Sequence, residues 1–271
     1  MLKKITKRDK LFSGKIKRLS QDWFNFDPFL ILHDRGYGTA EIWKFIIYQV
    51  QGDAARSLFF AHSNQHPFIG HEVKRDSENK IVFSCQILLK AYYLRYCIIL
   101  LQACGDKIAQ LVRCSLNVDQ WRFEDEKQIK EVKASENNTT LALLRRHLKL
   151  NEDEPKLLFQ AIDSYLNNDS VKMIVLDLAN EIKHRWVTSY QGEGLFPVKP
   201  RIKQEKNGSG RVIKEVIPMC GMTSGVDINI HIKHALITNN LFVDTAEKVK
   251  EILNFDKYYS KKNGKKYLAQ P

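Results

Sequence analysis

The most regular pattern of apolar and polar positions lies between residues 151 and 190. Two runs of apolar residues at helical spacing are separated by four polar residues, 167–170, and Asn151 with the three acidic residues after it is typical of a helix start. The first run contains Leu157, Leu158, Ala161, Ile162 and Tyr165, and the second contains Val171, Ile174, Val175, Leu178 and Ile182. This spacing predicts two antiparallel helices joined by a four-residue turn.

Residues 84–114 form the longest apolar segment, with five charged residues and no proline. An almost uniformly apolar helix belongs in a core, so we expect a central helix buried on most sides, with Gly105 as a position at which it bends or breaks. A shorter helix is predicted near residues 40–50, before the turn signal Gly52-Asp53. The polar stretch 124–140 is predicted to be a loop or a frayed helix end.

Beyond residue 195 the pattern changes, because Pro197 and Pro200 interrupt any helix. Asn207-Gly208, between two partly alternating runs, predicts a β-hairpin at 199–218, and a last helix is expected at 245–253. The fold class is therefore mainly α, with one hairpin and a C-terminal helix. We expect three consecutive parts. They are a basic arm with a helical segment (1–79), a helical bundle (80–192), and a hairpin, helix and basic tail packed on the bundle (193–271).

Charge is distributed unevenly along the 271 residues. The formal net charge is +12, of which residues 1–18 contribute +7 and residues 199–271 another +7, so the remainder sums to −2. A nearly neutral body with two basic ends indicates attraction to a polyanion such as nucleic acid. The alternative is that the basic ends only keep the protein soluble.

Five cysteines without a CxxC pair argue against a disulfide framework or a zinc site, and a reducing cytoplasm is the expected compartment. The longest uninterrupted apolar run, residues 96–101, is too short to cross a bilayer, so no membrane association is expected. Hydrophobic residues make up 44% and charged residues 27%, which excludes a disordered chain. The sequence contains no phosphate-binding glycine loop, no GxSxG elbow and no HExxH helix.

Candidate chemistry gathers near residue 184. On the second helix of the 151–190 pair, Asn180 and His184 lie one turn apart and nearly opposite the apolar face, flanked by Lys183 and Arg185. A histidine exchanges protons near neutral pH, and neighbouring cations stabilise charge on a phosphorane, as phosphodiester cleavage requires. The alternative is a solvated helix face that happens to include a histidine.

The segment Leu178-Ala179-Asn180-Glu181-Ile182-Lys183-His184-Arg185 resembles the signature of HEPN domains, an arginine followed by four to six residues, the first usually polar, and then a histidine. The resemblance covers residues 80–190 and implies a HEPN-like helical bundle. It also implies metal-independent endoribonuclease activity of toxin or antiviral-defence type, with His184 and Asn180 catalytic, RNA bound by Lys183 and Arg185, and no cofactor. One motif per chain implies a homodimer that shares a cleft, and an antitoxin or other regulatory partner is possible.

The chain departs from the signature at Ala179, which occupies the arginine position and offers neither a donor nor a charge. Either the protein is a natural inactive relative, or the arginine was replaced deliberately because an active ribonuclease harms its host. Retention of Asn180, Lys183 and His184 favours the second explanation.

Two other classes of function remain open, a non-catalytic nucleic-acid-binding module and a helical interaction protein. Elsewhere in the sequence, His231 and His234 are expected on a surface segment rather than at a metal, because no third ligand accompanies them. The spacing of Arg56 and His62 also matches the signature, but the apolar residues between them indicate coincidence.

Overall fold

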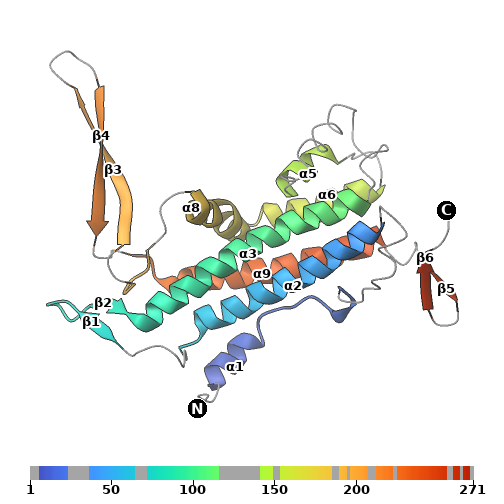
Figure 1. The fold of residues 1–271 in the computed structure, drawn as a ribbon, viewed down its shortest axis with the longest axis horizontal. Helices are drawn as coiled ribbons and strands as arrows, with labels where there is room; N and C mark the ends of the chain where they lie inside the picture. The colour runs from blue at the N-terminus through green and yellow to red at the C-terminus, as the bar shows by residue number, and fades with distance from the viewer. Residues whose placement is uncertain are drawn as a thin grey trace. The chain divides into compact units, whose positions relative to one another are not determined.

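A computed structural model confirms that the chain is mainly α-helical, with antiparallel two-stranded hairpins beside the helices (Figure 1). The structure describes residues 6–23, 37–64, 72–115, 141–148, 153–184, 189–193, 196–206, 212–221, 225–254, 259–262 and 265–268. The expected helix start at Asn151, the loop at 124–140 and the Asn207-Gly208 turn lie outside these residues.

Short helices begin the chain and lie between longer ones. They are α1 (Lys7–Ser13), the 3₁₀ turn η1 (Gln21–Trp23) and α5 (Leu141–His147). The helices of the 151–190 region are α6 (Asp153–Leu166), α7 (Asp169–Val171), the π-helical segment η4 (Lys172–Leu178) and α8 (Ala179–His184).

Three helices are much longer than the others, namely α2 (Tyr37–His62), α3 (Cys85–Ser115) and α9 (Ile228–Leu253). The prediction of a helix ending before Gly52-Asp53 was wrong, because α2 continues through both residues, and a Cβ at Gly52 would meet no atom within 4 Å. Gly105 does not end α3, which continues to Ser115. The last helix begins at Ile228 and not at residue 245.

The described residues form two compact units. Unit 1 consists of residues 1–15, 56–99 and 173–236, and unit 2 of residues 16–55, 100–172 and 237–271. Each of the three long helices contributes residues to both units. The division into three consecutive parts expected from the sequence remains a prediction.

Unit 2 is held together by polar contacts among segments far apart in the sequence. Gln51 of α2 accepts from the Leu19 amide (3.3 Å), and its own amide donates to Asn239 of α9 (3.0 Å). Trp23 donates to Glu247 at 2.9 Å. Because Gln51 and Asn239 are almost fully buried, these side chains satisfy each other where water cannot.

Unit 1 contains the second helix of the predicted 151–190 pair from residue 173 onward, whereas α6 belongs to unit 2, and it contains most of the described strands. Its hairpins are β1 (Val73–Arg75) with β2 (Ile81–Ser84), and β3 (Phe196–Lys206) with β4 (Val212–Gly221). The β3–β4 pair runs in register from Phe196↔Gly221 to Lys206↔Val212, with an irregularity between Val198 and Arg201, and confirms the predicted hairpin. A third hairpin, β5 (Tyr259–Lys262) with β6 (Lys265–Leu268), belongs to unit 2.

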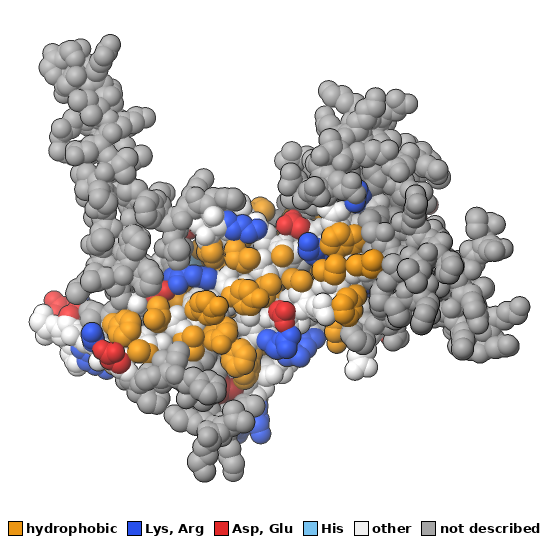
Figure 2. Space-filling model, viewed as in Figure 1, with side chains coloured by type: hydrophobic (Ala, Val, Ile, Leu, Met, Phe, Trp, Pro, Cys, Tyr) orange, Lys and Arg blue, Asp and Glu red, His pale blue; other side chains and the backbone are white. Residues whose placement is uncertain are grey.

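The α3 helix is less enclosed than its apolar composition predicted. Within unit 1, Leu88, Tyr92 and Tyr96 are 38%, 61% and 46% exposed, and Figure 2 shows hydrophobic side chains gathered along this helix on the face in view. The Cys85–Arg113 stretch is long and apolar enough to cross a membrane, a property that core helices of soluble proteins share. The sequence analysis considered only uninterrupted apolar runs, so it did not identify this longer stretch, in which a few charged residues separate the apolar ones.

Candidate functional site

The predicted turn between the two helices of the 151–190 region is present. Asn168 caps α7, its side chain accepting from the Ser170 amide at 2.9 Å, as an N-cap residue does. The preceding helix α6 buries Leu158, Ala161, Ile162 and Tyr165, whereas Leu157, predicted to be buried, is 46% exposed. Local sequence therefore determines the turn, whereas the packing of α6 against its neighbours determines which of its apolar residues are buried.

The helical stretch from α7 to α8 is anchored by one apolar face. Val171, Ile174, Val175 and Leu178 are at most 7% exposed, as their spacing predicted, whereas Ile182 of the same predicted series is half-buried. The segment η4 within this stretch is π-helical. A π-helical segment is uncommon and is found frequently at functional sites. The same face includes Ala179, which is fully buried.

The burial of Ala179 separates it from the residues that follow. Asn180 and Lys183 are exposed and Glu181 is half-buried, whereas the Cβ of Ala179 faces the interior. The Asn180 side-chain amide donates to the carbonyl of Leu176 at 2.6 Å, which holds it against its own helix. His184 is the last residue of α8, and the structure describes its backbone but not its side chain. Arg185 lies outside the described residues.

A buried ion pair lies in the same unit as α8. Arg95 of α3 pairs with Glu193 through both guanidinium nitrogens, one at 2.7 Å, and the two side chains are 17% and 0% exposed. Glu193 also accepts from the Tyr190 amide at 2.9 Å, and the Arg95 guanidinium lies 5.5 Å from the Tyr190 ring centroid. These contacts fix the loop 189–193 on α3.

The Tyr190 hydroxyl continues this network to α9, where it lies 3.1 Å from Nδ1 of His231. The expectation that His231 lies on a surface segment was wrong, since it is 7% exposed inside the first turns of α9. The signal was present in the sequence, because His231 falls between the buried Ile228, Ile232 and Ala235 at spacings of i, i+3, i+4 and i+7.

His231 also responds to charges on neighbouring elements. Burial lowers its pKa below the usual value, the nearby His234 lowers it further, and the Glu181 carboxylate of α8 opposes both effects. Burial raises the pKa of Tyr190, so its hydroxyl stays protonated. The carboxylate at the centre of the Asn180–Lys183 segment therefore interacts electrostatically with a histidine of α9, which sequence reasoning did not connect to this segment.

Two glycines permit the close approach of loop 189–193 to its neighbours. A Cβ at Gly225 would lie 2.7 Å from the Tyr190 carbonyl carbon. Gly192 has a φ of +80°, and a Cβ there would lie 2.6 Å from a methyl carbon of Ile87. Any other residue at 225 would push the loop backbone away from the segment before α9, and any other residue at 192 would be strained by the positive φ.

His62 ends α2 and stacks on Phe12, with ring centroids 3.7 Å apart. Burial, with Arg8 and Lys90 nearby, lowers its pKa. Arg56 is exposed on the same helix. The stacking gives His62 a packing role, in keeping with the view that its spacing from Arg56 is coincidental.

Within the described ranges, no three His, Cys, Asp or Glu side chains gather as a metal ion would need, and Cys85, Cys97 and Cys104 are free thiols. A scan against protein-family models matched none, and searches of curated proteins and of solved structures found no match. The HEPN likeness therefore depends on the α8 segment and the helical fold alone.

Proposed function

We propose that this protein is a cytoplasmic, metal-independent HEPN-type endoribonuclease of toxin or antiviral-defence class, impaired by alanine at position 179. The observation that carries the proposal is the arrangement of α8. One face of the helix is anchored in the core, while Asn180, one turn before the end of α8, and Lys183, one residue before it, are presented outward. His184 follows at the position of the family's histidine.

In this proposal the substrate's 2′-hydroxyl attacks the adjacent phosphate, and His184 exchanges the proton. Lys183 and Arg185 bind the phosphates, and Asn180 orients the nucleotide. The family's arginine would stabilise the phosphorane, and Ala179 has no group that replaces it. RNA is the proposed ligand, with no cofactor and no membrane.

A second candidate, a non-catalytic RNA-binding module, is favoured by one observation. Ala179 is fully buried, so the present packing accommodates a methyl group at this position, and a longer side chain must displace neighbours or extend along them to reach water. The two candidates share the same RNA-binding face and differ only in whether cleavage occurs.

Lys183→Gln is expected to weaken RNA binding to the same extent for unrelated sequences, because a lysine that contacts phosphate carries no base information. For single-stranded RNA the slope of log affinity against log salt should fall by about 0.7 for each lost phosphate contact. Fluorescence anisotropy at four salt concentrations measures this slope. Lys248→Gln, which removes one exposed positive charge on α9, is the control, and an equal effect of both variants would contradict a specific RNA-binding face.

The proposed partner is a second copy of the chain, because each chain carries one motif. Light scattering at micromolar concentration should give the mass of a dimer. The exposed stripe of Leu88, Tyr92 and Tyr96 on α3 is the expected contact, so Tyr92→Lys with Tyr96→Lys should produce monomers. Leu157→Lys, which alters an equally exposed apolar residue of α6, should leave the dimer intact. A monomeric parent protein would contradict the shared cleft.

A further inference from the structure

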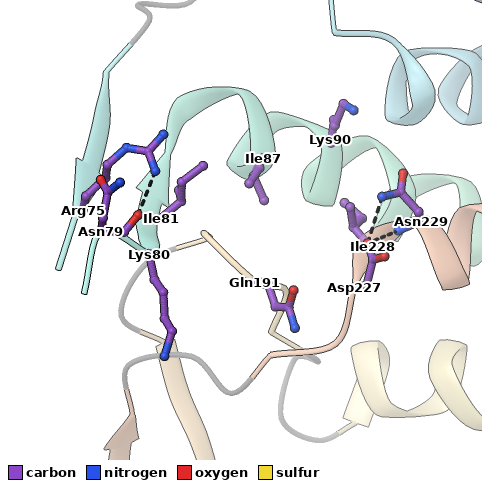
Figure 3. Close-up of a pocket in the computed structure, with 10 residues that line it drawn as sticks. All are labelled: Arg75, Asn79, Lys80, Ile81, Ile87, Lys90, Gln191, Asp227, Ile228 and Asn229. Atoms are coloured by element: carbon purple, nitrogen blue, oxygen red, sulfur yellow. Dashed lines mark hydrogen bonds between the residues drawn. The ribbon is translucent and has the colours of Figure 1, made fainter. Parts of the chain in front are cut away.

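A cavity of about 760 Å³ lies in unit 1, and its described lining includes no residue of α8, which carries the proposed RNA site (Figure 3). It is bounded by the β1–β2 hairpin, the first turns of α3, Gln191 and the start of α9. Figure 3 shows Ile81 and Ile87 on one side of this space, with Gln191 and Ile228 across from them. Its volume falls within the range of small-molecule sites.

Lys90 is the most informative residue of the cavity wall. It is 9% exposed, and its ammonium has no hydrogen-bond or ion-pair partner among the residues that the structure describes. Burial and the nearby Arg8 lower its pKa, against the weaker opposing effects of Asp9 and Asp227. A buried ammonium without a partner is costly, and an anion in the cavity would supply one.

The charged side chains around the cavity also favour an anion. Arg75 and Lys80 add two cations at the hairpin, and Asp227 is the one carboxylate among the described residues that line the cavity. That carboxylate already accepts from the amide and the side chain of Asn229, at 2.9 and 2.8 Å. Positive charge therefore exceeds negative charge around this space.

The uncharged part of the lining fits a nucleobase. Ile81, Ile87 and Ile228 provide an apolar surface, and Gln191 with Asn229 provides amide groups that can both donate and accept. We propose that this cavity binds a mononucleotide, with its phosphate at Lys90 and its base against the isoleucines that lie between Lys90 and Arg75. The proposal is independent of the RNA-binding face on α8.

Isothermal titration calorimetry of the full chain with 5′-AMP, adenosine and inorganic phosphate tests this assignment. AMP should bind more tightly than adenosine, and phosphate should compete with it. Lys90→Gln should weaken AMP binding by about tenfold to 100-fold, because a charge-assisted hydrogen bond is lost. Lys74→Gln is the control, since it removes one lysine charge on the hairpin that bounds the cavity, and Lys74 pairs with Glu72 and is not among the residues that line the cavity.

Several outcomes would overturn the proposal. These are the absence of AMP binding at millimolar concentration, equal affinity for adenosine and AMP, or a Lys90→Gln variant that binds AMP as well as the parent. If circular dichroism shows that Lys90→Gln does not fold, the exposed Arg75→Gln decides in its place and should weaken AMP binding more than Lys74→Gln does. Lys183→Gln should leave AMP affinity unchanged, so that failure here is distinguishable from failure of the RNA-binding proposal.

Discussion

Ala179→Arg is expected to raise metal-independent RNA cleavage by about 10²–10³-fold, the effect of one transition-state donor in other enzymes. A guanidinium at this position carries a permanent charge and can bind a phosphate through two parallel hydrogen bonds. The products should carry 2′,3′-cyclic phosphate ends, and adding His184→Ala should abolish the gain. Gel assays of RNA cleavage in EDTA, with mass spectrometry of the ends, measure both expectations.

The burial of Ala179 adds a packing cost that the experiment must separate from chemistry. An arginine stem in this fully buried site must displace neighbours or extend along them to water, at a cost of about 1–3 kcal/mol. Ala179→Met imposes a similar packing change without a guanidinium, so it is the matched control. We expect both variants to lower the melting temperature and only the arginine variant to gain cleavage.

Three results would count against the ribonuclease proposal. A folded arginine variant that neither cleaves RNA nor harms its host would favour the RNA-binding module. Cleavage that stops with EDTA would contradict the metal-independent mechanism. If the arginine variant does not fold, the unchanged chain decides, and trace activity that persists in His184→Ala would contradict the catalytic role of His184.

Arg95→Ala is expected to lower the free energy of unfolding by about 3–5 kcal/mol, because it leaves the Glu193 carboxylate buried and unpaired. Glu193 is 1% exposed, and Arg95 forms its buried ion pair. Urea unfolding followed by circular dichroism measures the loss. Arg145→Ala is the control, because the Arg145–Asp163 pair is more exposed, at 27% and 35%, and should contribute no more than about 1 kcal/mol.

The double variant Arg95→Met with Glu193→Gln tests the same explanation from the opposite direction. It removes both charges, so no unpaired ion remains in the core, and it should recover most of the stability that Arg95→Ala loses. If Arg95→Ala costs no more than Arg145→Ala, or if the double variant is less stable than the single one, the ion pair does not hold loop 189–193 as inferred.

Local sequence was sufficient for features that depend on neighbouring residues. The apolar spacing from Val171 to Leu178, the cap at Asn168 and the β3–β4 hairpin all appear as predicted. Periodicity and turn chemistry act over a few residues, so they can be recognised without knowledge of packing. The mainly α class follows from the same signals.

Tertiary structure alone decided which residues meet. Arg95 and Glu193 are 98 residues apart, and no local pattern pairs them. The sequence predicted His231 on a surface segment. In the structure α9 begins at Ile228, so His231 lies in a helix and its imidazole is beside Tyr190. Tyr92, on a helix expected to be enclosed, is 61% exposed. Hydrophobic periodicity identifies the apolar face of a helix, whereas the burial of each side chain depends on the element that covers it.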